Sequence, residues 1–148
     1  MTKGLLKKDK GFTIIEVVLV LAIAGLIFLI VFLALPQLQK SRRDTQRRND
    51  GGRMVSSLES WAGNNNGNYP TSTGERTSFL SEYITDQINT PDGNNYSITW
   101  GTSTNPGGTD NVVIAVGSGT DCDGNAMSGR TTAVRVGLEQ GVYCQDNK

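Results

Sequence analysis

One carboxylate stands alone in a long apolar stretch near the N-terminus. Glu16 is the only charged residue between Phe12 and Gln39. In apolar surroundings an ionised carboxylate is strongly unfavourable unless it is neutralised or paired. Four lysines lie within the first ten residues, and Gly11 precedes Phe12 directly. We therefore expect Glu16 to need a cationic partner. The alternative is a protonated glutamic acid near a membrane interface.

Catalytic chemistry has little support in the sequence. The chain has no histidine, which removes the commonest general base and the commonest transition-metal ligand. Serine, aspartate and cysteine are present, but no recognisable nucleophile motif surrounds them. We predict that the protein is not an enzyme.

The formal net charge of zero conceals four blocks of different charge. Residues 1–11 carry +3, and residues 12–39 carry only the charge of Glu16. Residues 40–53 carry +4, and residues 54–148 carry −6. A basic leader, an apolar segment, a basic segment and an acidic head are typical of an anchored protein rather than of a nucleic-acid-binding domain.

Residues 12–35 predict a transmembrane helix. At ~1.5 Å per residue this apolar segment extends roughly 36 Å, which is enough to cross a ~30 Å hydrocarbon core. A buried core helix does not fit, because the remaining chain cannot cover an element that is apolar on every face. A secretory signal peptide does not fit either, because Ala34 lacks the second small residue of an Ala-x-Ala site. Basic residues on both sides do not settle the orientation, but the cysteines and the Asn/Gly-rich head favour an N-in, head-out arrangement.

Residues 36–62 predict an amphipathic extension of this helix. Pro36 should kink the helix rather than necessarily end it. Apolar residues recur at helical spacing between Met54 and Ala62. Gly51-Gly52 is a weak point where the helix could loosen, and the Asn/Gly run that starts at Asn64 should end it.

Residues 63–148 predict a globular head of mixed structure. A short helix and a small antiparallel sheet are expected, with turn signals between the strands. Because so small a sheet needs a partner, we expect the Met54–Ala62 face of the helix to cover it, which gives an α+β fold. The expected helix is Ser78–Ile84, and the expected strands are Tyr96–Trp100, Asn111–Val116, Thr132–Leu138 and Val142–Cys144.

Residues 8–35 resemble the class III signal of type IV pilins and of the pseudopilins of type II secretion. That signal has a short basic leader, a glycine, a phenylalanine, a threonine, two aliphatic residues and a glutamate. Residues 11–16, Gly-Phe-Thr-Ile-Ile-Glu, match it position for position. Tyr69-Pro70 also resembles the family's junction between helix and loop. Pro36 departs from the pattern, because the family's usual proline lies a few residues earlier.

The resemblance implies a pilin fold, with a long N-terminal helix, partly transmembrane, packed on a small antiparallel sheet. A prepilin peptidase would cleave the leader, residues 1–11, between Gly11 and Phe12 and methylate the new Phe12 amine. Glu16 would then neutralise that amine in a neighbouring subunit, and such a pair would fix subunit register. An inner-membrane platform and an assembly ATPase are the further implied partners. The precursor would be a single-pass membrane protein that becomes part of an extracellular filament.

The C-terminal region contains a candidate disulfide and a candidate calcium loop. The even cysteine count in an extracytoplasmic-looking segment favours a disulfide between Cys122 and Cys144, the alternative being two free buried thiols. Such a bridge also resembles the C-terminal disulfide loop of many pilins. Asp121, Asp123 and Asn125 resemble the start of a calcium loop, and some pseudopilins bind calcium here. No other cofactor is expected.

The basic segment 40–50, which we call the collar, has four interpretations. It is a solvated helical segment with Asp44 paired to Arg47 or Arg48, a contact to lipid head groups, a partner for the acidic head of another subunit, or a DNA-binding patch. The absence of interleaved aromatic residues places DNA last.

The expected function is that of a structural subunit of a type IV pilus that serves adhesion, twitching motility or DNA uptake. A pseudopilin of a type II secretion or competence system is the closest alternative. A single-span membrane-anchored binding protein is the alternative of another class, but a plain anchor would not need Glu16.

Overall fold

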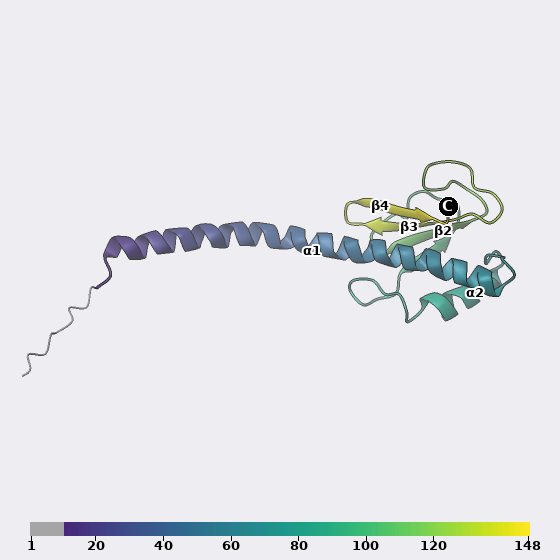
Figure 1. Cartoon of the computed structure of the whole chain (residues 1–148), viewed down its shortest axis with the longest axis horizontal. Coiled ribbons are helices and arrows are strands. Elements are labelled where there is room, and N and C mark those ends of the chain that lie inside the picture. The colour runs from purple at the N-terminus through teal and green to yellow at the C-terminus, as the bar shows by residue number, and fades with distance from the viewer. Residues whose placement is uncertain (1–10) are drawn as a thin grey trace, which may run out of the picture. The chain divides into compact units, whose positions relative to one another are not determined.

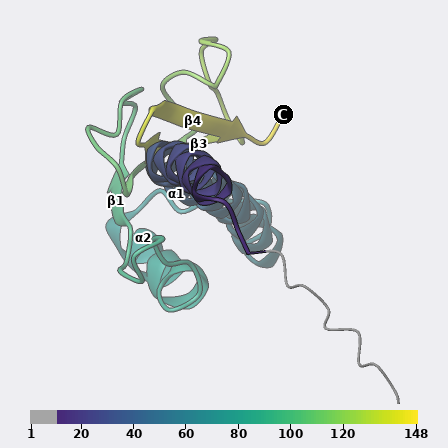
Figure 2. The ribbon, with the colours of Figure 1, turned by 90° about the vertical axis from the view of Figure 1, so that its left-hand side faces the viewer.

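The computed structural model describes residues 11–148 and divides the chain after Gln39 into two units. Of the predicted leader, only Gly11 lies within the described residues. In chain order the elements are the helices α1 (Ile14–Asn64) and α2 (Thr73–Phe79), the π-helical turn η1 (Leu80–Ile84), and the strands β1 (Ser97–Trp100), β2 (Asn111–Val116), β3 (Thr132–Leu138) and β4 (Gly141–Asp146). Figure 1 labels most of the elements, and Figure 2 labels β1 as well.

Within the described residues, the N-terminal unit is an apolar helix whose side chains are exposed. The first part of α1 is long and apolar enough to cross a membrane, and none of its most apolar stretch is buried by the described chain. The large apolar side chains from Phe12 to Leu38 are exposed. The helix continues through Pro36, which is consistent with a proline that does not end it. This confirms the predicted apolar helix.

The second unit, residues 40–148, contains a four-stranded sheet in the order β1-β2-β3-β4. The pairs β2–β3 and β3–β4 are antiparallel, as predicted. β1 instead pairs with β2 in parallel, with Ser97 opposite Asn111, so the prediction of a wholly antiparallel sheet is wrong at this edge. The reason is the connection after Trp100. It is too long for a tight hairpin and carries the chain back to the level at which β1 began.

This connection crosses the sheet on the side away from α1. A Cβ atom built on Gly137 of β3 would lie 1.7 Å from the carbonyl oxygen of Gly108. Glycine therefore allows the connection to pass directly over the central strand. The loop between β2 and β3 covers more of this face, with Met127 packed on Ala133. Every residue of β3 is therefore buried, whereas a strand covered on one face only would alternate.

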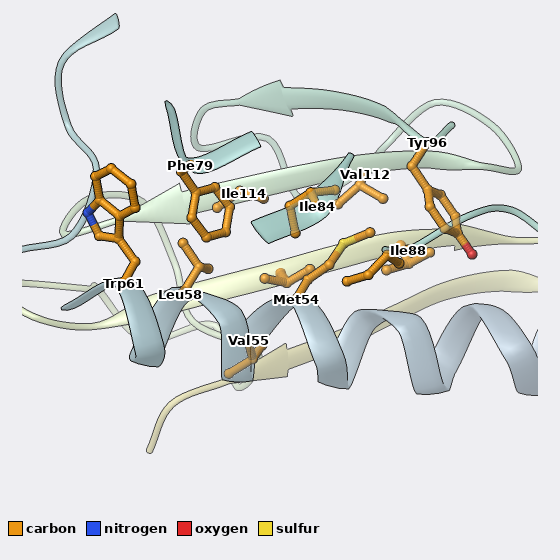
Figure 3. Packing of buried hydrophobic residues seen from close by; sticks show 12 residues of the cluster. Met54, Val55, Leu58, Trp61, Phe79, Ile84, Ile88, Tyr96, Val112 and Ile114 are labelled. Carbon is orange, nitrogen blue, oxygen red and sulfur yellow. The ribbon is translucent and has the colours of Figure 1, made fainter. Parts of the chain in front are cut away.

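The core lies between α1 and the other face of the sheet. Met54 and Leu58 point from α1 toward the side chains of β2, and Trp61 lies beside Phe79 (Figure 3). Around Trp61 the aromatic rings of Phe79 and Tyr83 pack at centroid distances of 6.0 and 5.8 Å. The predicted face of the helix is therefore the face that packs on the sheet.

Gly51 has a packing role that differs from the predicted weak point. The helix is continuous through Gly51 and Gly52. A Cβ atom on Gly51 would lie 3.0 Å from Cγ2 of Val136 and 3.1 Å from the ring of Tyr143. The glycine allows the helix to approach β3 and β4 closely, so the conformational cost of glycine in a helix is offset by contact.

A helical segment lies on another side of α1 from strands β3 and β4, as Figure 2 shows. It begins earlier than predicted, at Thr73 instead of Ser78. Ser72 Oγ accepts from the backbone N–H of Glu75, and Glu75 Oε2 accepts from the N–H of Ser72. This capping box satisfies the first free amides and starts the helix one and a half turns earlier.

Candidate processing and assembly site

The residues around Glu16 form the N-terminal cap of α1. Thr13 immediately precedes the helix, and its backbone N–H and its hydroxyl donate to Glu16 Oε2 at 2.8 and 2.7 Å. The N–H of Glu16 lies 3.4 Å from Thr13 Oγ1. This is the reciprocal pattern of a capping box, Thr-x-x-Glu. Glu16 therefore has a local structural role that the sequence analysis did not assign to it.

The carboxylate of Glu16 remains open to an external partner. The residue is exposed, and its contacts within the described chain are those with Thr13. A negative charge in the first turn also interacts favourably with the helix dipole. The cap holds the carboxylate at the helix end, one turn from Phe12, where an amine on that residue would be created by cleavage.

Gly11 and Phe12 precede the helix and are accessible. Both lie outside regular structure. Phe12 is 89% exposed, and a Cβ atom on Gly11 would meet nothing within 4 Å. A peptide bond between two such residues is open to an enzyme that binds extended chain.

Comparison with known proteins bears on this segment. Residues 6–32 match the family model of the prokaryotic N-terminal methylation motif. The chain carries the class III signal of type IV pilins and pseudopilins. The class III signal includes Gly11, Phe12 and Glu16 and most of the apolar segment, and it supports a membrane-anchored precursor of the pilin or pseudopilin kind. No curated protein and no solved structure matches the chain.

Beyond the class III signal, the collar binds the head of its own chain. The Arg47 side chain is 3% exposed and contacts three carboxylates. Its Nε donates to Asp110 at 2.8 Å, and its Nη1 lies 3.0 Å from Asp44 and 3.4 Å from Glu139. Arg43 Nε donates to Glu139 at 2.5 Å. These contacts join α1 to the loops that precede β2 and follow β3.

Burial and the neighbouring charges shift the pKa of Arg47 in opposite directions. Burial disfavours the charged guanidinium of Arg47, but the hydrogen bonds and charges of its acidic partners, with Asp110 first, outweigh it and raise its pKa. The hydrogen bond from Arg43 lowers the pKa of Glu139, with a further contribution from Arg47. The charged forms of Arg47 and Glu139 are therefore both favoured by this contact.

The first interpretation of the collar is confirmed in one respect and wrong in another. Asp44 does pair with Arg47. Arg47 and Asp50, however, are buried and not solvated. Asp50 Oδ2 accepts a hydrogen bond from the Tyr96 hydroxyl at 2.8 Å, and burial, with the help of Asp50, raises the pKa of Tyr96. Lys40, Arg42 and Arg48 remain exposed.

Cys122 and Cys144 form the predicted disulfide. The bridge ties the loop before β3 to β4, and Arg135 of β3 reinforces the same attachment. Its Nη2 donates to the carbonyl oxygen of Thr120 and, at 3.1 Å, to that of Asp121. Arg135 is buried without a carboxylate within 4 Å in the described part of the chain, so backbone carbonyls provide its partners.

The Asp121 carboxylate already accepts hydrogen bonds and pairs with a cation within its own chain. Its Oδ1 accepts from the backbone N–H groups of Asp123 and Asn125 at 2.9 and 2.8 Å. Its Oδ2 contacts the Lys148 ammonium, which also lies 3.3 Å from Asp123. Lys148 is the main cause of the low pKa of Asp121, about 2. Among residues 11–148, no three His, Cys, Asp or Glu side chains gather as a metal site.

Proposed function

We propose that this chain is a structural subunit of a type IV pilus, cleaved between Gly11 and Phe12 and polymerised through the apolar part of α1. The observation that carries the proposal is an exposed apolar helix that begins at the class III signal and contains a single acid, Glu16. The exposed side chains need an apolar environment, first the bilayer and then the helices of other copies.

Transfer from bilayer to filament gives little hydrophobic energy, because lipid tails are as apolar as the packed helices. Close packing and polar pairing must therefore stabilise the filament. Cleavage creates a positively charged amine on Phe12, and methylation keeps that charge. An amine of one subunit and Glu16 of another form a pair in apolar surroundings, where an unpaired charge is strongly penalised.

The proposal assigns the partners and the location of the protein. A prepilin peptidase processes the precursor in the inner or cytoplasmic membrane, with the N-terminus inside. A platform protein and an assembly ATPase then extract it into an extracellular filament. The filament serves adhesion, twitching motility or DNA uptake, and the subunit itself catalyses no reaction.

Two alternatives lead to different measurements. A pseudopilin would carry the same processed N-terminus but would form a short filament that remains in the periplasm or wall. A single-span membrane-anchored binding protein would keep its leader and stay in the membrane. Glu16 favours a filament of either kind over the plain anchor, because an uncharged glutamine would complete the same cap without placing a carboxylate in apolar surroundings.

We further propose that the head needs no calcium. The Lys148 ammonium supplies the positive charge against Asp121 that a calcium ion would supply. Asp123 and Asn125 direct backbone N–H groups toward the Asp121 carboxylate, and a cation is repelled by such donors.

The proposed function is tested on surface material removed by shearing. We expect the intact mass and the first residue to correspond to a chain that begins at methylated Phe12. Changing Gly11 to a bulky residue should abolish both processing and filaments. The same chain found only in membranes and beginning at Met1 would refute the pilus and pseudopilus alternatives together.

A further inference from the structure

A polar groove lies on the side of the head where the sheet does not cover α1. Its volume is about 620 Å³. α1 forms the floor, β4 contributes Tyr143 and Gln145 to one wall, and the chain from η1 onward contributes Tyr83 and Gln87 to the other. Gly52, Ser56 and Ser60 recur every four residues along the floor, so small side chains keep the groove open.

The groove is positively charged. Arg48 and Arg53 line it, and none of its lining residues in the described chain is acidic. Arg48 is exposed, with its guanidinium 5.6 Å from the centre of the Tyr143 ring and no carboxylate within 4 Å in residues 11–148. Arg53 donates to the carbonyl oxygen of Gln87 at 2.8 Å. These contacts fix the walls and leave the positive charge of Arg48 without an acidic partner.

Exposed acidic residues lie on the segment that forms one wall of the groove. Residues 77–129 contain no lysine or arginine. Within that stretch, Glu82 on η1 and Asp86 in the following turn are exposed, and neither has a cation within 4 Å in the described part of the chain. Tyr83 and Gln87, the neighbours of these two acids in sequence, line the groove.

The groove and the acidic residues have opposite charge and do not pair within one chain, so they suit a head-to-tail contact between two copies. In a helical filament each copy presents one surface to the copy before it and a different surface to the copy after it. Complementary charge on those two surfaces fixes register and disfavours wrong contacts.

We propose that Glu82 and Asp86 of one copy bind in the Arg48 groove of the next copy. This inference rests on the proposed function, because it requires a filament, and it adds a contact between heads to the contact between apolar helices. It names a second copy of this chain as the occupant of the groove.

The test is a charge exchange in the full-length chain, in cells that assemble the filament. R48E and the pair E82R/D86R should each lower the amount of sheared filament by at least about tenfold, and the triple variant should recover most of it. R42E, which changes an exposed collar arginine outside the groove, should have little effect. The melting temperature of each chain in detergent identifies variants that do not fold, and R48Q replaces R48E if the reversed charge disturbs Tyr143.

The outcomes separate this inference from the function on which it rests. Wild-type material that begins at Phe12, with R48E and R48Q filaments unchanged in amount, overturns the inference and leaves the proposed function standing. Folded single variants without filaments and a triple variant without recovery also overturn it. An R48E filament that assembles normally but loses salt-sensitive DNA binding would make the groove a polyanion site and overturn it as well. A wild-type chain that is never cleaved removes both proposals.

Discussion

Substitution of Gly137 by alanine should destabilise the head severely. The added Cβ atom would lie 1.7 Å from the Gly108 carbonyl oxygen and 2.7 Å from its carbonyl carbon, whereas ordinary contact begins at 3.4 Å. The obstacle is backbone, so no rotamer change relieves it. The connection must move by roughly 1.7 Å, and Asp110, which binds Arg47, lies two residues farther along.

The expected loss follows from this geometry. Overpacking a core typically costs ~1–3 kcal/mol. Displacing the connection also disturbs the Ser97 N–H···O=C Asp110 bond, 3.0 Å long, at the edge of the sheet. We therefore expect a loss of at least about 3 kcal/mol, from a total of ~5–15 kcal/mol for a typical domain. The melting temperature should fall by roughly 10–20 °C.

The assay is thermal and denaturant unfolding of residues 40–148, which contain the whole buried core. Gly101→Ala is the matched control, because Gly101 lies in the same connection and an added Cβ there meets nothing within 4 Å. We expect the control to stay within about 0.5 kcal/mol of the wild type. Equal stability of the two variants would refute the close approach of this connection to β3.

Four further predictions concern the charged and cross-linked parts of the head. Arg47→Met should lower the unfolding free energy by about 2–4 kcal/mol, because it leaves the partly buried Asp44 and Asp110 carboxylates without a cation, whereas Glu139 keeps Arg43. Replacing Cys122 and Cys144 by serine should cost about 3 kcal/mol in the loop-entropy account. Asp121 has a folded pKa of about 2, below its ordinary 3.8. The ionised Asp121 carboxylate therefore stabilises the fold above about pH 4, and this contribution is lost as pH falls toward 2. In Asp121→Asn the free energy of unfolding should depend less on pH over this interval. Excess calcium should leave the melting temperature unchanged, because Lys148 already pairs with this carboxylate.

Three of these have a control variant or an outcome that would contradict them. Arg42→Met removes an exposed collar charge and should change stability by less than about 0.5 kcal/mol. A similar loss in both arginine variants would contradict the buried cluster. Asp123→Asn should keep most of the acid dependence, because Asp121 accepts the greater number of hydrogen bonds. A melting temperature that rises with calcium and returns with chelator would contradict the proposal that Lys148 replaces the ion.

Local patterns predicted the elements of the fold well. The apolar run, the end of α1 at Asn64 and the bounds of β2 and β3 all follow from periodicity and turn residues. The two capping boxes, at Thr13 and at Ser72, could also have been predicted from the sequence, since both show the Ser/Thr-x-x-Glu pattern. The second of them would have placed the start of α2 correctly.

Non-local contacts explain what could not be predicted. The direction of β1 depends on a connection that passes over Gly137, and no local sequence pattern predicts the contact between Gly108 and Gly137. Arg47 finds Asp110 and Glu139 at separations of 63 and 92 residues. A run of charges in one sequence cannot reveal which of its members will be buried. Gly51 was predicted to be a weak point of the helix, because the residue that it packs against, Val136, lies far away in the sequence.

The disulfide has a mechanical consequence. Cys122 and Cys144 close a covalent loop around β3 and the first part of β4. If tension on the head detached the sheet, the segment between Asn64 and Cys122 could be drawn out, but the closed loop could not. With a sequence separation of 22 between the bridged positions and ~3.4 Å per extended residue, roughly 75 Å of chain length is withheld from extension. The central strand and its antiparallel partner would thus stay connected under load and ready to pair again when the load is released.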